Sequence, residues 1–512
     1  MQHGYRGCTI HPLKPEPTRT FVEAGTVLTT AVLLTTVLLG RTGFAAGEGA
    51  FVYPGWEMLE SGDWIVPRLF GMVDLRCGVL VAWLQGAAAW MFGQTEIVAR
   101  IIPAAAFVAM CMACFAFARR WFGRPWGLVA GLACSVTPIW WWEGRSADPQ
   151  VIHGLFAMLA VCLVIDRALG PRRRSTIASI GAMWGIAAAV AGMLLTAGPS
   201  GAPVILAVLV ALVITTRSIL TALWPGTLLM VTAGGLAWAA WVMAMRSALV
   251  HETVHALPPV ILGAFWDPDA RFILKGSSWA PFCVCLCWVP WRGRMNQDGP
   301  MGAAHRTATS STLGYTFVLS LCALWATGGP TLPALTLLPL CIAGVGAHRL
   351  AGQKLAGSRS GVHARPIAVT VFSFLLVATI VLTLMAERGR ESAKGDALRL
   401  GDALLGQRAE HRELWAEGIA ANTPEVLRYA CDRAYERGQW ITPRWKFREK
   451  DDPPNLPPEG SYVVVQTQER VRANNGREEL SDFEAAGASR WPLEFTGKTH
   501  NWSYQVFRSP PP

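Results

Sequence analysis

The chain has 512 residues, of which 52% are hydrophobic and only 16% are charged. About a quarter of the residues of a soluble globular protein are charged, so this composition indicates contact with lipid and argues against an ordinary soluble enzyme. The net charge of +10 comes largely from basic residues in short segments between apolar runs, which is typical of membrane topology. We therefore expect membrane lipid, and no nucleic acid, as a partner.

The chain begins with polar residues 1–20, which are followed by an apolar run at 21–40. That run is long enough to cross about 30 Å of hydrocarbon, so we predict a cytoplasmic N-terminus and a first span. A cleaved signal peptide is the alternative, because Phe44-Ala45-Ala46 resembles a cleavage site. The long polar segment before the apolar run favours the span.

Residues 41–96 form a long, polar and aromatic connection. Its carboxylates are Glu48, Glu57, Glu60, Asp63 and Asp74. A carboxylate at a membrane surface can act as a general base or bind a divalent cation. For Glu57 and Glu60, which lie three residues apart, a solvated helix face is the alternative.

The same connection carries Trp56, Trp64 and Trp83. Their rings could stack on a sugar or a prenyl chain, although Trp is also enriched at membrane interfaces. We expect a short helix at 54–59. The apolar stretch 79–93 is too short to span, which indicates a re-entrant or interfacial helix.

Further apolar runs predict about eleven spans in all. After the first, they are expected at 97–117, 126–142, 150–167, 175–197, 201–217, 222–245, 277–291, 311–327, 330–347 and 367–385. Alternate connections are rich in arginine, which places them in the cytoplasm. The connections 41–96, 143–149, 198–200, 246–276 and 328–329, together with residues 386–512, then lie on the extracytoplasmic side.

Residues 386–512 are more charged and contain β-like runs at 462–465 and 504–507. We predict a small α/β domain outside the membrane. Of the twelve cysteines, Cys77 and Cys431 are expected on the oxidising side, and a disulfide between them is left open.

The connection 246–276 contains His251-Glu252-Thr253-Val254-His255. This pattern fits the spacing of a zinc protease motif, but the sequence offers no third ligand. An interfacial helix whose histidines face a phosphate or an acceptor is one alternative, and ordinary solvated polar residues are the other.

Residues 55–100 resemble the first outer loop of the polyprenyl-phosphate-sugar glycosyltransferases. These belong to the GT-C superfamily, which includes the lipid A aminoarabinose transferases and the protein O-mannosyltransferases. The matching positions are Glu57-Met58-Leu59-Glu60-Ser61-Gly62-Asp63-Trp64, Pro67, Trp83, Phe92-Gly93, Glu96 and Arg100. Residues 119–124 also resemble the first cytoplasmic loop of the family.

The sequence departs from the family at charged positions. The Asp-Glu pair of the family falls on Gly47-Glu48, so the usual catalytic Asp is absent. The lysine of the family falls on Cys77, with Arg76 one position earlier. In the second outer connection, an expected Asp near Gln150 is missing, although Asp148 is close.

The resemblance implies an all-α, GT-C type membrane domain at 21–385 and an extracytoplasmic domain at 386–512. It implies transfer of a sugar from a polyprenyl-phosphate donor to a lipid-linked, envelope glycan or protein acceptor. The expected location is the bacterial inner membrane, with the C-terminal domain in the periplasm. The alternative is an inactive relative that binds lipid or a partner protein. A transporter is disfavoured, because the spans are almost free of charge.

The resemblance also suggests roles for individual residues. Glu48 is the candidate catalytic base and a candidate ligand for a divalent cation such as Mg or Mn. The remaining candidates are Arg76, Arg145 and Arg100 for the donor phosphate, and Asp63, Asp148, Trp64, His251 and His255 for the acceptor or sugar. Arg100 could equally pair with Glu96 or cap a helix.

Overall fold

The structure is a computed structural model of the 512-residue chain. It describes residues 17–37, 39, 44, 48–69, 72–74, 78–170, 176–218, 225–249, 303–326 and 332–355, and five strands between 412 and 508.

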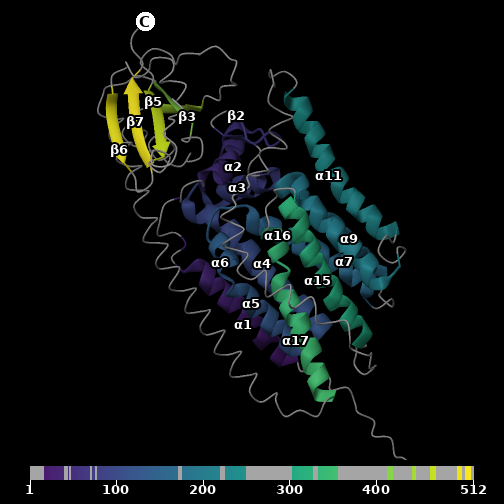
Figure 1. The fold of residues 1–512 in the computed structure, drawn as a ribbon. Coiled ribbons are helices and arrows are strands. Elements are labelled where there is room, and N and C mark those ends of the chain that lie inside the picture. The colour runs from purple at the N-terminus through teal and green to yellow at the C-terminus, as the bar shows by residue number, and fades with distance from the viewer. Residues whose placement is uncertain are drawn as a thin grey trace, which may run out of the picture.

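The first 355 residues are mainly helical where they are described (Figure 1). In chain order the helices are α1 (Pro17–Thr36), α2 (Gly49–Ser61), α3 (Val79–Phe92), α4 (Glu96–Phe122), α5 (Arg124–Ser135), α6 (Pro138–Gly144), α7 (Gln150–Leu169), α8 (Thr176–Ala197), α9 (Ala202–Thr216), α11 (Pro225–Leu249), α15 (Ala303–Ala326), α16 (Leu332–Leu335) and α17 (Leu338–Leu355). A 3-10 turn, Gly198–Gly201, joins α8 to α9, and a small hairpin, β1 (Arg68–Leu69) with β2 (Met72–Val73), follows α2.

Helices long and apolar enough to cross a membrane occur at Glu96–Phe122, Gln150–Leu169, Ile180–Ala197 and Gly226–Leu249. The chain is therefore a multi-pass membrane protein. The predicted number of about eleven spans is not confirmed, because these four are the helices that meet the length and hydropathy requirements within the described part of the chain. The spans expected at 277–291 and 367–385 lie outside the described residues.

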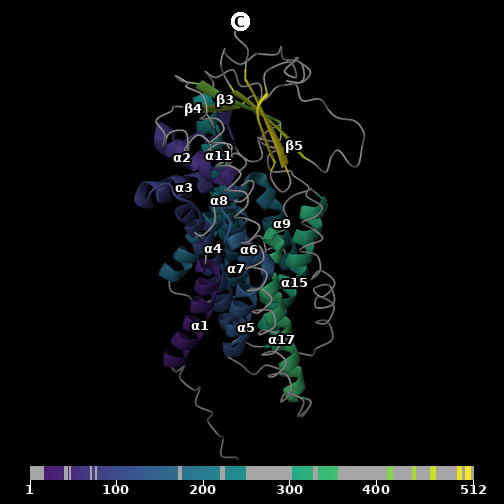
Figure 2. The same ribbon diagram turned by 90° about the vertical axis from the view of Figure 1, so that its left-hand side faces the viewer.

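Helices α4 and α7 form the centre of the helical body, as the two views in Figures 1 and 2 show. Both carry many buried apolar side chains, among them Phe107, Met110 and Met158, which are fully buried. In contrast, only 17% of the apolar window of α11 is buried. The inner helices therefore have neighbours on most sides, and α11 presents most of its surface outward.

The prediction of one continuous span at 126–142 is wrong, because this segment is divided into the two helices α5 and α6. The break falls at Val136 and Thr137, directly before Pro138. Proline disfavours the helical conformation of the residue before it. Thr137 accordingly has φ −71° and ψ 116°, and α6 begins with Pro138 at its first position.

Both short helices predicted in the first loop are present. The helix expected at 54–59 is longer, since α2 covers Gly49–Ser61 with Pro54 inside it. The apolar stretch 79–93 forms α3, and its last residues Trp90, Met91 and Phe92 are between 58% and 74% exposed. This exposed aromatic end is consistent with an interfacial helix.

The strands of the C-terminal region are β3 (Arg412–Gly418), β4 (Ile441–Trp445), β5 (Tyr462–Gln468), β6 (Leu493–Lys498) and β7 (Trp502–Arg508). They form one mixed sheet in the order β4-β3-β5-β7-β6. Strand β3 is parallel to β4 and β5, whereas β7 is antiparallel to β5 and β6.

Both predicted β-like runs of this region are strands. They pair directly with each other, with Val463 opposite Phe507 and Val464 opposite Val506. Parallel neighbours need long crossover connections, commonly helices. Those connections lie outside the described residues, so an α/β domain remains a prediction. In both views the sheet lies beyond the end of the helical body that carries α2 and α3 (Figures 1 and 2).

Candidate functional site

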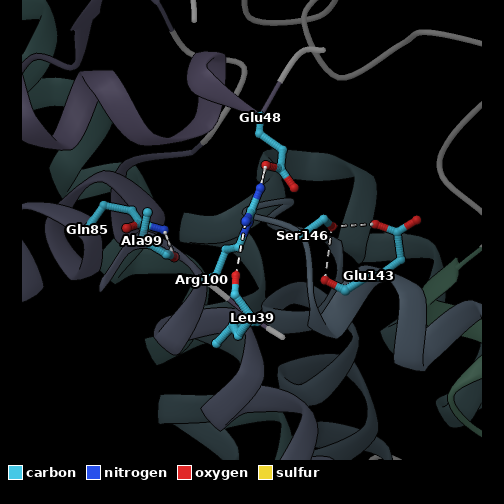
Figure 3. Close-up of polar contacts among 7 residues, drawn as sticks. All are labelled: Leu39, Glu48, Gln85, Ala99, Arg100, Glu143 and Ser146. Carbon is cyan, nitrogen blue, oxygen red and sulfur yellow. Dashed lines mark hydrogen bonds and ion pairs between the residues drawn. The ribbon is translucent and has the colours of Figure 1, made fainter. Parts of the chain in front are cut away.

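A buried ion pair joins the first loop to α4. Arg100 lies in the second turn of α4, which begins at Glu96 and is capped by Thr95, whose hydroxyl accepts the Val98 N–H. The Arg100 side chain is 1% exposed, and its Nη2 lies 2.6 Å from Oε2 of Glu48, which is 5% exposed (Figure 3). The structure thus brings together two of the predicted site residues. A pairing of Arg100 with Glu96 stays a prediction.

Arg100 is also fixed by other groups. Its Nη1 donates to the Leu39 carbonyl at 3.0 Å (Figure 3). Its guanidinium carbon lies 5.8 Å from the centre of the Phe44 ring. Removing one partner from such a buried pair leaves an uncompensated charge, which costs about 3–5 kcal/mol. The pair therefore holds Glu48 in one place at the start of α2.

Asp148 lies close enough to Glu48 for the two charges to interact. It belongs to the connection between α6 and α7, and its Oδ1 accepts the N–H of Gln150, the first residue of α7, at 2.8 Å. Burial raises the pKa of the Asp148 carboxyl from 3.8 to about 6. The hydrogen bond from Gln150 opposes this shift, and the negative charge of Glu48 adds to it.

Glu143 was missed by the sequence analysis. It lies in α6, is 6% exposed, and its Oε2 accepts a hydrogen bond from Ser146 Oγ at 3.4 Å (Figure 3). Its position in the sequence could have identified it, because Glu143 lies two residues before the candidate Arg145. It also ends an aromatic run, Trp140-Trp141-Trp142-Glu143, and an acidic side chain in such a run is unusual enough to mark a candidate site residue.

Arg145, predicted to bind phosphate, is 3% exposed, and its side chain hydrogen-bonds to the end of α1. Its Nη1 donates to the carbonyls of Leu34 at 3.0 Å and Val37 at 2.5 Å. Trp141 Nε1 donates to the same Leu34 carbonyl at 2.9 Å. The last carbonyls of a helix have no partner within it and carry partial negative charge, so a cation stabilises them. The phosphate role of Arg145 stays a prediction.

The Gly62-Asp63-Trp64 motif forms the turn that ends α2. Gly62 has φ +74°, a conformation that glycine adopts readily, and its N–H donates to the Met58 carbonyl at 3.0 Å. Asp63 Oδ1 then accepts the N–H groups of Ile65 at 3.0 Å and Val66 at 3.3 Å. These local bonds account for the glycine and the aspartate without any ligand.

Two indoles anchor the segment after this turn. Trp83 Nε1 of α3 donates to the Trp64 carbonyl at 2.6 Å, and Trp241 Nε1 of α11 donates to the Ile65 carbonyl at 3.0 Å. The Trp64 ring is 38% exposed and packs on Gly86 of α3. Trp83 therefore has a structural role in the loop, and the contact of Trp64 and Asp63 with a sugar or acceptor stays a prediction.

Several predicted site residues lie outside the described residues, namely Arg76, Cys77, His251, His255 and Cys431. Within the described part of the chain, no group of three or more His, Cys, Asp or Glu side chains is placed to hold a metal ion. Glu48 and Asp148 do not by themselves complete a divalent cation site.

The family model described as dolichyl-phosphate-mannose-protein mannosyltransferase matches residues 77–264. Two curated relatives are undecaprenyl phosphate-alpha-4-amino-4-deoxy-L-arabinose arabinosyl transferases. That of Edwardsiella ictaluri is 29% identical over 126 residues, 24% of this chain and 23% of the relative. That of Pectobacterium carotovorum is 28% identical over 166 residues, 32% of this chain and 29% of the relative. The matches span less than a third of the length of either relative.

Among solved structures, ArnT from Cupriavidus metallidurans bound to undecaprenyl phosphate is similar, with a TM-score of 0.60 and 15% identity over 96% of this chain and 98% of that one. Its apo structure has the same TM-score at 17% identity, with the same coverage of both chains. At such identities the likeness shows the fold. The resemblance to the polyprenyl-phosphate-sugar glycosyltransferases of the GT-C superfamily is therefore confirmed, in the sequence of residues 77–264 and in the fold of the chain.

Proposed function

We propose that the protein is a membrane glycosyltransferase that moves a sugar from a polyprenyl-phosphate donor to a lipid, glycan or protein acceptor. The observation that carries this proposal is the buried Glu48–Arg100 pair with Asp148 beside it. It supplies two interacting carboxylates at the edge of a GT-C type helical body. The similar ArnT structure contains undecaprenyl phosphate, which supports a polyprenyl-phosphate donor.

The proton of the acceptor is taken by the Glu48–Asp148 pair. A general base works best when its pKa lies near the operating pH. With a pKa of about 6, Asp148 is mostly ionised at neutral pH and is still a stronger base than an ordinary aspartate. Glu48, held by Arg100, orients the acceptor hydroxyl or amine, which attacks the anomeric carbon with inversion. In the simpler alternative, Glu48 itself takes the proton of the acceptor.

The phosphate leaves with its charge neutralised by basic residues. Of the three predicted phosphate residues, Arg100 is paired with Glu48, and Arg145 donates to carbonyls at the end of α1. We therefore assign the first contact with phosphate to Arg76. A divalent cation, Mg or Mn, remains a proposal for Glu48, and no step of the mechanism depends on it.

The reaction takes place on the extracytoplasmic face of the bacterial inner membrane, with the C-terminal domain in the periplasm. Two observations support this side. The arginine-rich connections alternate with the connections that contain Glu48 and Asp148. The C-terminal sheet lies beyond the end of the body that carries α2 (Figure 2).

The test is turnover by purified protein in lipid nanodiscs, with a panel of sugar-bearing undecaprenyl phosphates and a bacterial envelope lipid extract as acceptor. We expect Glu48→Gln to lower turnover by about 100-fold or more, because the carboxylate pair that takes the acceptor proton then loses one of its two members. The matched control is Glu60→Gln, which alters an exposed carboxylate of the same loop that bonds Gln94 at 3.1 Å. Turnover of Glu60→Gln should stay near that of the wild type.

An inactive relative that binds lipid is the second candidate. The observation that favours it is that both described phosphate candidates, Arg100 and Arg145, already have partners within the protein. Binding of undecaprenyl phosphate by the wild type without turnover of any donor supports this candidate. Equal turnover by the wild type and Glu48→Gln removes Glu48 from the mechanism.

A further inference from the structure

Gln150 and His153 lie on one face at the beginning of α7, directly after Asp148. They are three residues apart, the spacing that brings helical side chains together. His153 is 2% exposed. Neither residue has a part in the mechanism above, although the Gln150 N–H donates to the Asp148 carboxylate of that mechanism.

The surroundings of His153 identify which ring nitrogen carries hydrogen. Nδ1 lies 3.2 Å from the Met193 carbonyl oxygen and 3.2 Å from Thr196 Oγ1, both on α8. The Thr196 hydroxyl donates to backbone carbonyls of α8 at 2.9 Å, so its oxygen offers a lone pair to the ring. Because both neighbours accept, Nδ1 donates. Burial favours the neutral ring, in which Nε2 is then a bare acceptor directed away from α8.

Two buried acceptor atoms therefore occur within one helical turn. Nε2 of His153 and Oε1 of Gln150 are both buried and without a hydrogen-bond partner among the described residues. Buried polar atoms are nearly always paired, and an exception calls for a ligand, a water or another explanation. Two such exceptions within one helical turn, directly after Asp148 in the chain, indicate a position for a molecule that donates hydrogen bonds.

We propose that Gln150 Oε1 and His153 Nε2 bind hydroxyl or amino hydrogens of the sugar carried by the polyprenyl-phosphate donor. This inference rests on the proposed function. A sugar presents several donors close together, whereas the phosphate anion of the donor presents lone pairs that the two acceptors would repel. The subsite therefore recognises the sugar and leaves the lipid phosphate to basic residues.

Two substitutions of His153 distinguish the role of Nδ1 from the role of Nε2. In His153→Asn the short amide can keep a donor near Nδ1 for Met193, but it has no atom at the place of Nε2. In His153→Gln the longer amide restores an acceptor near Nε2 and loses the fit to α8. Gln150→Met removes the second acceptor with little change in volume. The control is Ser320→Ala in α15, which removes another buried hydroxyl without a partner in the described part of the chain.

The measurement is the dissociation constant in nanodiscs for two kinds of probe. One is bare undecaprenyl phosphate, and the other is a set of undecaprenyl phosphates that carry a hexose or 4-amino-4-deoxy-L-arabinose. We expect the wild type to prefer one sugar-bearing probe over the bare lipid. We expect His153→Asn and Gln150→Met to reduce that preference by about 3- to 10-fold, the effect of one lost hydrogen bond. His153→Gln and Ser320→Ala should keep it within about 2-fold.

Unchanged preference in both His153→Asn and Gln150→Met overturns the proposal and leaves an ordered water as the occupant. A wild type that binds all probes equally also overturns it. A wild type that binds none of them contradicts the proposed function itself. Equal loss of affinity for the bare and the sugar-bearing lipid shows general damage to the fold and does not support a sugar subsite.

Discussion

Two parts of the first loop differ in what they do. The motif segment, Glu57–Ile65, contains the residues Glu57 to Trp64 on which the sequence resemblance to the family rests, and its turn is held by backbone and indole hydrogen bonds. The charged cluster, Glu48 with Arg100 and Asp148, lies directly beside Gly47, where the Asp expected from the family resemblance is absent, yet it contains the buried ion pair. In this loop the motif forms the turn that ends α2, and the residues proposed for catalysis lie outside the motif.

The difference has a physical origin. A turn that ends a helix and enters a hairpin needs glycine at a positive φ and a short acceptor after it, whatever the protein binds. A buried carboxylate needs a cation near it, and that cation can come from any helix that reaches it. The first requirement is local in sequence and the second is not.

The largest expected effect tests the charged cluster. Arg100→Met leaves the buried Glu48 without its cation, so we expect a loss of about 3–5 kcal/mol in the free energy of unfolding. Denaturant unfolding in detergent micelles measures it, and adding Glu48→Gln should recover part of the loss. The control is Arg68→Met, whose half-exposed partner Asp63 lies 4.0 Å away, with an expected loss below about 1 kcal/mol. Equal losses in both variants would contradict the comparison.

The packing of the motif segment is tested next. A Cβ at Gly86 would lie 2.7 Å from the Gly55 carbonyl oxygen and 3.0 Å from the Trp64 ring. Gly86→Ala must therefore separate α2 from α3, at a cost of about 1–3 kcal/mol in unfolding free energy. Gly181→Ala, in α8 with open space around it, is the control. If Gly86→Ala is as stable as that control, Trp64 does not pack on α3.

The charged cluster should make the free energy of unfolding depend on pH. The pKa of Asp148 is raised from 3.8 to about 6, so between these values the folded state holds a proton that the unfolded state has released. Stability should therefore fall as pH rises through this window, by up to about 1.4 kcal/mol per pH unit. Asp148→Asn should flatten the slope, as seen in unfolding midpoints at pH 4, 5 and 6. An identical slope in the variant would exclude Asp148 as its source.

The smallest effect concerns one hydrogen bond of the motif segment. Trp83→Phe keeps an aromatic ring and removes the N–H that donates to the Trp64 carbonyl at 2.6 Å. We expect a loss of about 0.5–1.5 kcal/mol in unfolding free energy. Trp90→Phe, at the exposed end of α3, should change stability by less than half of that. Turnover should survive both changes, because neither touches the charged cluster.

Much of the fold follows from local sequence. Apolar length predicts α4, α7, α8 and α11, and short runs of β-forming residues predict the strands β5 and β7, whose pairing only the structure shows. The division of the span at 126–142 was also within reach, since Pro138 marks it. The helix at 79–93 was identified because it was apolar and too short to span.

The membrane class, the family resemblance and the candidates Glu48, Arg100 and Asp148 all follow from the amino-acid sequence without coordinates. The three-dimensional arrangement was needed to see that Arg100 pairs with Glu48, 52 positions away, and that Arg145 donates to the carbonyls at the end of α1. A buried charge is balanced by whichever group the packing of helices brings near, and helix packing is not encoded in the spacing of a motif. For the same reason the paired acceptors of Gln150 and His153 became visible only once the neighbours of α7 were in place.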